Sequence, residues 1–85
     1  MRSFCYAITD PIGLHMTPGG KLVALVKTLD SRVTISAGGS AVDAGKLLRI
    51  VSLGITTGTQ VTVPIEGGDE EASYRKLYTF FAAEL

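Results

Sequence analysis

Apolar and polar residues alternate with a period of two in three stretches of the chain, which is typical of half-buried β-strands. These stretches are residues 3–8, 32–37 and 61–65. In the first, Phe4, Tyr6 and Ile8 share one face of the predicted strand. The dipeptide Gly38-Gly39 is a two-residue hairpin signal, so the pattern predicts a fourth, short strand at residues 40–43, antiparallel to the strand before it.

Three other stretches place apolar residues at helical spacing. The first is residues 21–29, and the second is a short helix at residues 46–53 that Gly54 is expected to end. The third is expected to begin after Asp69 as its N-cap. Its predicted inner face contains Leu77, Phe80, Phe81 and Leu85. The resulting order is β-α-β-β-α-β-α, and the simplest arrangement is an α+β two-layer sandwich with one mixed or antiparallel sheet and all helices on one face.

One residue conflicts with this regular pattern. Pro64 lies within the last predicted strand. Because proline has no N–H to donate, it favours an edge strand or a bulge. We expect a bulge here or an unpaired site on the neighbouring strand.

The composition predicts one folded domain, residues 1–85, with 46% hydrophobic and 19% charged residues. Eight basic residues balance eight acidic ones, which argues against a protein that mainly coats nucleic acid or an anionic membrane. No apolar run is long enough for a membrane span, and no apolar segment typical of a signal peptide follows Arg2. The single cysteine, Cys5, excludes an internal disulfide and a multi-cysteine zinc site, and is expected to be inert. We therefore expect a small cytoplasmic protein.

The only histidine, His15, lies between a Pro- and Gly-containing loop and a predicted helix. Pro18 is compatible with a first helical turn, so His15 is expected at or next to the N-cap. Unpaired backbone N–H groups and the positive end of the helix dipole favour an anion there. An imidazole beside them is suited to accept and release a phosphoryl group. From spacing alone, a plain surface or capping histidine remains the stronger alternative, because no acid, second histidine or metal ligand is visible nearby.

Several motifs together resemble one known family. They are Gly13-Leu14-His15, Pro18, Leu22-Val23, Ser52-Leu53-Gly54, Gly58, Val61-Thr62-Val63 and Gly67-Gly68-Asp69-Glu70. In this register, without insertion or deletion, the chain resembles HPr, the phosphocarrier family of the bacterial sugar phosphotransferase system. The resemblance implies an HPr-like open-faced β-sandwich, with a four-stranded antiparallel sheet and three helices on one face.

The resemblance also implies a carrier protein rather than an enzyme that acts alone. Phosphorylated Enzyme I would transfer a phosphoryl group to His15, which would pass it to sugar-specific enzyme IIA domains. The backbone amides of Met16 and Thr17 would hold the phosphate. The docking surface, which also includes Met16 and Thr17, would comprise Gly20, Leu47, Leu48, Arg49 and Val51. The resemblance implies no cofactor, no metal, no nucleic acid and no membrane, and a monomer is the default.

The chain departs from the family pattern at positions that matter for this function. Thr17 replaces the usual arginine beside the histidine, which removes a charge-assisted contact of about 1.5–3 kcal/mol. Thr17 itself or Lys21, one turn further along, could compensate. Lys46 occupies the position of the serine that an ATP-dependent kinase phosphorylates in many relatives, so that switch is expected to be absent. These two departures favour an alternative function, a regulatory or interaction module that docks partners without efficient phosphoryl transfer.

Two further features bear on docking. Gly19-Gly20 leaves three possibilities open: a mobile first turn, a later helix start, or close approach of a partner backbone. Leu47 and Leu48 lie on a short helix that need not bury both side chains, so one exposed leucine would make sense as an anchor. The alternative, that both leucines pack inward, is equally open. Lys46 and Arg49 would form a basic patch that suits an acidic partner, or simply a solvated helix face.

Overall fold

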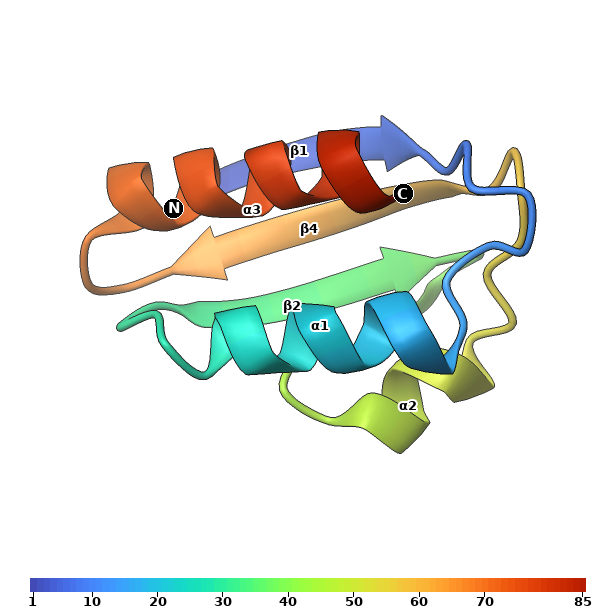
Figure 1. Ribbon diagram of the computed structural model, residues 1–85. Helices are drawn as coiled ribbons and strands as arrows, with labels where there is room; N and C mark the ends of the chain where they lie inside the picture. Colours follow the sequence, from blue (N-terminus) through green and yellow to red (C-terminus); the bar gives the residue numbers. More distant parts are fainter.

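The computed structural model describes residues 1–85 and contains the predicted order of elements (Figure 1). They are β1 (Arg2–Ala7), α1 (Met16–Val26), β2 (Arg32–Ala37), β3 (Ser40–Asp43), α2 (Leu47–Ser52), β4 (Gln60–Glu66) and α3 (Glu70–Glu84). The strands β2 and β3 have the predicted bounds, because the Gly38-Gly39 turn separates them sharply. Both glycines have positive φ values, +58° and +85°, as a tight hairpin requires.

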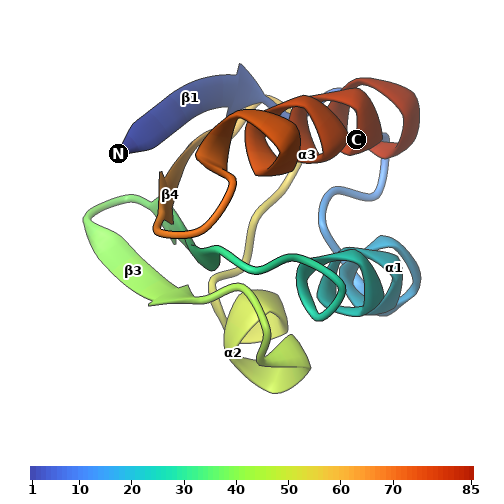
Figure 2. The same ribbon diagram turned by 90° about the vertical axis from the view of Figure 1, so that its left-hand side faces the viewer.

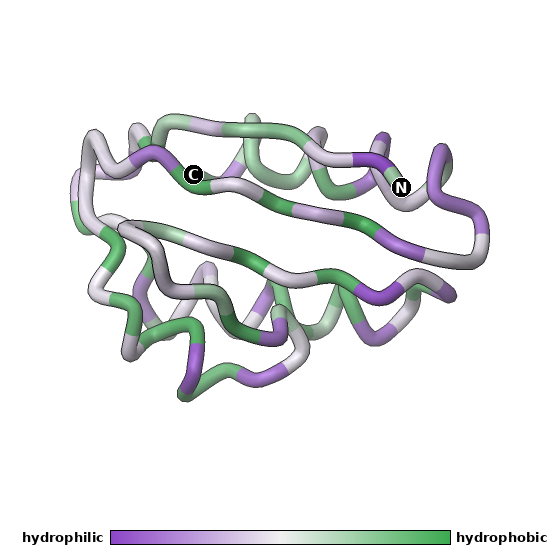
Figure 3. The backbone as a smooth tube through the Cα atoms, turned by 180° about the vertical axis from the view of Figure 1, so that it is seen from behind, coloured by the Kyte–Doolittle hydropathy of each residue, from purple (hydrophilic) through white to green (hydrophobic).

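The four strands form one sheet in the order β1-β4-β2-β3, and every neighbouring pair is antiparallel. This confirms the antiparallel sheet and excludes the mixed one. All three helices cover the same face (Figure 2). Seen from behind, the other face has no helix in front of the strands (Figure 3). The protein is therefore an open-faced, two-layer α+β sandwich, as expected.

The core fills the space between the sheet and the helices. Phe4 on the inward face of β1 and Ile8, directly after the strand, are both buried, while the alternate residues Ser3, Cys5 and Ala7 are exposed. Leu77 and Phe81 of α3 are fully buried against this face. The rings of Phe4 and Phe81 meet edge to face at 5.4 Å between centroids, a geometry worth about 0.5–1.5 kcal/mol beyond the area it buries. The predicted inner faces of β1 and α3 are confirmed.

Pro64 changes the pairing of β4 on one side only. Residues of β4 pair with β1 without interruption, and Ser3 lies opposite Pro64. On the other side, β2 pairs with β4 at Arg32, Val33 and Ser36, and the pairing lapses at Thr34 and Ile35. The register is the same before and after the lapse, so no residue is inserted and there is no bulge. The expected unpaired site on the neighbouring strand is confirmed.

The bounds of α1 correct the prediction of a helix over residues 21–29. The helix begins at Met16 and includes Gly19 and Gly20, so the possibility of a later start was wrong. Gly19 is buried, and a Cβ built on it would lie 3.0 Å from Cδ1 of Leu47. Two glycines weaken a helix by about 0.5–1 kcal/mol each, yet here the first lets α2 approach closely. The close approach that Gly19 permits is therefore between α1 and α2 of the same chain.

The other end of α1 is also shorter than predicted. The helix ends at Val26 with Lys27 as its C-cap. The next N–H groups make tighter bonds, from Thr28 to the Leu25 carbonyl and from Leu29 to the Val26 carbonyl. Leu29 still packs against the core from this tight turn. The apolar spacing therefore continued past the α-helix into a 3₁₀-like turn.

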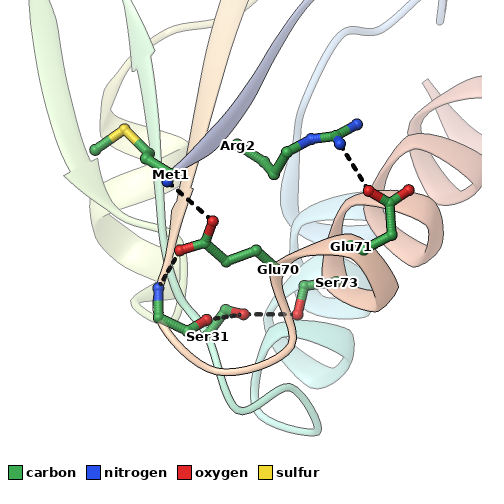
Figure 4. A network of polar contacts seen from close by, with 7 residues as sticks. Met1, Arg2, Ser31, Glu70, Glu71 and Ser73 are labelled. Atoms are coloured by element: carbon green, nitrogen blue, oxygen red, sulfur yellow. Dashed lines mark hydrogen bonds and ion pairs between the residues drawn. The ribbon is translucent and has the colours of Figure 1, made fainter.

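A polar network closes the end of the sheet that lies far from His15 (Figures 1 and 4). The buried hydroxyl of Ser31 bonds the Ser73 hydroxyl at 2.8 Å and donates to the Gly67 carbonyl at 2.7 Å. The Glu70 carboxylate accepts the Gly67 N–H at 2.7 Å and pairs with the Met1 amino group at 3.0 Å. These contacts lower the pKa of Glu70 from its ordinary value of 4.5, with the Gly67 N–H as the largest cause. Asp69 is the N-cap of α3, as predicted.

Candidate functional site

His15 is the N-cap residue of α1, as its position in the sequence predicted. Its backbone is extended, with φ −104° and ψ −165°, and its carbonyl accepts the first helical hydrogen bond from Gly19 at 2.8 Å. The imidazole makes no capping hydrogen bond and is half-buried. The ring nitrogens are therefore not used for the fold, and one of them can react.

The first turn of α1 offers two backbone donors next to His15. The N–H groups of Met16 and Thr17 have no acceptor within the helix, because the first N–H groups of any helix lack one. Pro18 has no N–H to offer. Both residues with free amides are exposed, so their donors reach the solvent where the positive end of the helix dipole also points. The arrangement can hold an anion beside the imidazole.

The loop before His15 is packed tightly against the loop that follows α2. The N–H of Leu14 donates to the Ile55 carbonyl at 3.1 Å. Gly13 has φ +87°, and a Cβ built there would lie 2.4 Å from the Ile55 oxygen and 2.7 Å from Cα of Thr56. Only glycine fits this position without moving the backbone. Gly13 thus determines the path by which the chain reaches His15.

Thr17 and Lys21 were the two residues that could compensate for the missing arginine. Thr17 is exposed, and its hydroxyl makes no hydrogen bond within the protein. The ammonium group of Lys21 is in an ion pair with the Glu84 carboxylate at 3.2 Å, on α3. In this conformation Lys21 is therefore directed toward α3, and its charge is already partly neutralised.

The residues expected on the docking surface lie on two adjacent helices, α1 and α2 (Figure 1). Leu48 is 75% exposed, whereas Leu47 is half-buried against Gly19. The expectation that one of the two leucines is exposed is confirmed. Arg49 is exposed, while Gly20 and Val51 are half-buried. Ile50, at 0% exposure, is the only fully buried residue of α2.

A hollow of about 530 Å³ lies where α1 and α2 meet, and it brings in one residue that the sequence did not single out. The hollow is lined by Val23, Lys27, Gly45, Lys46, Leu47, Leu48 and Arg49. Lys27, the C-cap residue of α1, joins Lys46 and Arg49 there, and none of the three takes part in an ion pair. The signal in the sequence was weak, namely that Lys27 follows Val23 by one helical turn. A separate hollow of about 480 Å³ between α1 and α3 contains none of the predicted site residues.

Two other findings bear on the kind of site. The chain contains no group of three or more His, Cys, Asp or Glu side chains placed to hold a metal ion. None of its helices is both long and apolar enough to cross a membrane. Cys5 is exposed on the open face of the sheet, with its sulfur 3.5 Å from the Thr62 hydroxyl.

Comparison with known proteins agrees with the fold and identifies a family. Residues 2–83 match the family described as "PTS HPr component phosphorylation site". A phosphocarrier protein HPr of Buchnera aphidicola is 36% identical over 70 residues, covering 82% of each chain. Another, of Lysinibacillus sphaericus, is 28% identical over 79 residues, covering 93% of this chain and 90% of its own. The solved histidine-containing phosphocarrier protein of Mycoplasma superposes with a TM-score of 0.92 at 24% identity, covering 96% of this chain and 93% of its own.

These matches, together with the open-faced fold, define the class of the protein as a small phosphocarrier domain. Within that class, the chain belongs to the HPr family of the phosphotransferase system.

Proposed function

We propose that this protein accepts a phosphoryl group from phosphorylated Enzyme I on His15 and passes it to sugar-specific enzyme IIA domains. The observation that supports this best is the half-buried imidazole at the N-cap of α1, free of hydrogen bonds and next to the unpaired amides of Met16 and Thr17. Membership of the HPr family supports the same chemistry. The protein would act as a monomeric carrier in the cytoplasm.

The transfer needs only one reacting group from this chain. A ring nitrogen of His15 attacks phosphorus with its lone pair, and a phosphorus–nitrogen bond forms while the bond to the donor histidine breaks. The electron pair of the broken bond returns to the donor imidazole, so no phosphate is released to water. Transfer to an enzyme IIA domain repeats the exchange with His15 as the leaving group. The amides of Met16 and Thr17 stabilise the negative charge of the phosphoryl oxygens in both directions.

Thr17 leaves this charge stabilised mainly by backbone groups. A well-formed charge-assisted bond from arginine would contribute about 1.5–3 kcal/mol. Its absence corresponds to a transfer rate roughly 10- to 150-fold lower, at about 1.4 kcal/mol for each factor of ten. We therefore expect a slower carrier than a relative that has arginine at this position.

The docking surface we propose consists of Gly20, Leu47, Leu48, Arg49 and Val51, together with Met16 and Thr17. Leu48 is exposed at its centre and would insert into an apolar pocket of the partner. The unpaired cations of Lys27, Lys46 and Arg49 surround the adjacent hollow and would attract an acidic rim. Lys46 cannot accept a phosphoester, so docking would not be switched by phosphorylation at that position.

A second candidate function is a regulatory or interaction module that docks the same partners without efficient transfer. Thr17 favours this second function because its side chain supplies no positive charge to the phosphoryl group. The ion pair between Lys21 and Glu84 favours it as well, because the ammonium group of Lys21 is directed toward α3 and its charge is already partly neutralised. The two candidates share the docking surface and differ only in turnover at His15.

The first experiment is phosphorylation of the purified protein by Enzyme I and phosphoenolpyruvate, followed by intact mass spectrometry. We expect an acid-labile gain of one phosphoryl group that is absent from His15→Ala. A folded protein that gains no label with a cognate Enzyme I, yet binds it, would refute the carrier and establish the docking module.

A further inference from the structure

The orientation of His15 depends on the loop that precedes it. The imidazole has no side-chain partner, so the backbone at residues 8–15 decides where the ring and the first amides of α1 lie. Three backbone bonds join this loop to the loop of residues 54–59: from Ile8 to the Thr59 carbonyl at 3.0 Å, from Gly58 to the Ile8 carbonyl at 2.8 Å and from Leu14 to the Ile55 carbonyl at 3.1 Å. The N–H groups of Thr9 and Asp10 and the Thr9 hydroxyl donate to the Leu85 oxygen. The contacts nearer to His15 involve the side chains of Asp10 and Thr57.

Asp10 holds the turn that leads to His15. Its carboxylate oxygen Oδ1 accepts the N–H of Ile12 at 2.8 Å and that of Gly13 at 3.2 Å. The Gly13 N–H also donates to the Asp10 carbonyl, at 3.0 Å. The carboxylate therefore closes an Asx turn. This turn fixes the backbone of residues 10–13, directly before Leu14 and His15.

Thr57 links this turn to the neighbouring loop. Its hydroxyl Oγ1 donates to the Asp10 carbonyl at 2.5 Å, across 47 positions of sequence. Among the hydrogen bonds between the two loops it is the only one made by a side chain. The neighbouring Thr56 bonds only Thr59, within its own loop. Asp10 is thus held by its own carboxylate, by Thr57 and by the bond from its N–H to the Leu85 oxygen at 2.8 Å.

We infer that Asp10 and Thr57 are positioning residues for phosphoryl transfer at His15, an inference that rests on the proposed function above. They hold the loop so that the ring and the amides of Met16 and Thr17 face one point together. Backbone donors stabilise a transferring group only when they are fixed in advance at the right distance. Because Thr17 provides no guanidinium to follow the phosphoryl group, this chain depends on the fixed backbone more than a relative with arginine does.

The test uses pairs of variants in single-turnover transfer from phosphorylated Enzyme I, at a temperature where thermal unfolding shows each variant to be fully folded. Thr57→Val removes the hydroxyl that reaches Asp10, while Thr56→Val removes a hydroxyl from the same loop that does not. We expect Thr57→Val to lower the maximal rate about 3- to 10-fold, as the loss of one hydrogen bond to a positioned group would. We expect Thr56→Val to stay within about twofold. The concentration at half-maximal rate should not change in either, because α2 is untouched.

A second pair tests the carboxylate. Asp10→Ala should lower the maximal rate in the same range, and Asp10→Asn, which keeps an oxygen acceptor, should restore most of it. The amide resonances of Met16 and Thr17 provide a readout without turnover, since phosphorylation should shift them less in Thr57→Val and Asp10→Ala than in the unmodified chain.

The possible outcomes separate this inference from the function on which it rests. An unmodified chain that takes no phosphoryl group refutes the proposed function. A chain that is phosphorylated normally while Thr57→Val and Thr56→Val have the same maximal rate and the same amide shifts overturns the positioning role. A lower rate in Thr57→Val without any change in the amide shifts of Met16 and Thr17 overturns it as well, because the two donors would then not be displaced.

Discussion

Replacing Gly13 by alanine tests whether the loop before His15 is as tightly packed as the structure has it. The backbone there has φ +87°, which costs a residue with a Cβ about 1–2 kcal/mol. The Cβ would also lie 2.4 Å from the Ile55 oxygen, so the two loops must separate and weaken the bond from Leu14 to Ile55, worth about 0.5–1.5 kcal/mol. Together these effects predict a loss of about 1.5–3.5 kcal/mol, a large part of the 5–15 kcal/mol typical of a domain.

Substitutions at two other glycines of the same chain serve as controls. Gly58 has the same φ, +87°, but a Cβ built on it meets nothing within 4 Å. Gly58→Ala should therefore lose only the conformational part, about 1–2 kcal/mol. Gly20 lies in α1 with free space around it, so Gly20→Ala should gain about 0.5–1 kcal/mol. The expected order of stability is Gly20→Ala, the unmodified chain, Gly58→Ala and then Gly13→Ala.

Urea unfolding followed by circular dichroism gives the free energy of unfolding of each variant. For a domain of this size, each kcal/mol also shifts Tm by about 4–8 °C, which thermal unfolding can measure independently. The reasoning fails if Gly13→Ala is no less stable than Gly58→Ala, because the close approach of the two loops would then contribute nothing.

Three further predictions concern charge. Thr17→Arg should raise the rate of phosphoryl transfer by at least about tenfold if a charge-assisted bond forms, and an unchanged rate would mean that the backbone amides suffice. Arg49→Ala should slow association with Enzyme I about two- to fivefold at low salt and reduce its salt dependence, whereas Arg75→Ala, an arginine on α3, should do neither. The lowered pKa of Glu70 means that its contribution to stability is complete above its ordinary value of 4.5 and is lost as the pH falls through the lowered pKa. Glu70→Gln should therefore be less sensitive to acid in urea unfolding between about pH 6 and pH 3, and identical acid curves would contradict this.

The elements that could be predicted from the sequence are those that local patterns define. Alternating residues and the Gly38-Gly39 hairpin located β2 and β3 with their bounds, and Asp69 located the start of α3. The apolar period alone missed the start of α1, because residues 16–20 have no such period and contain two glycines of low helix propensity. Gly19 is buried against Leu47, and this contact between two helices lies outside any local window of sequence.

The candidate site likewise has parts that local sequence predicts and parts that depend on contacts between distant segments. The position of His15 at an N-cap follows from residues close to it in sequence, and so it could be predicted. The contact between Thr57 and Asp10 could not, because it joins a hydroxyl to a backbone carbonyl 47 positions away. The grouping of Lys27 with Lys46 and Arg49 likewise depends on how α1 packs against α2.

The proposed site consists largely of backbone groups, and this explains which substitutions it should tolerate. The amides of Met16 and Thr17 are present whatever side chain follows His15, so threonine in place of arginine removes a charge but leaves the donors in position. A change at Thr17 should therefore alter the rate without altering the geometry. Changes at Gly13, Asp10 or Thr57 alter the path of the backbone and displace the imidazole and both amides together. Because an arginine side chain can follow a displaced phosphoryl group and fixed amides cannot, adding Thr17→Arg to Thr57→Val should raise the rate by a larger factor than adding it to the unmodified chain, and equal factors would mean that the two changes act independently.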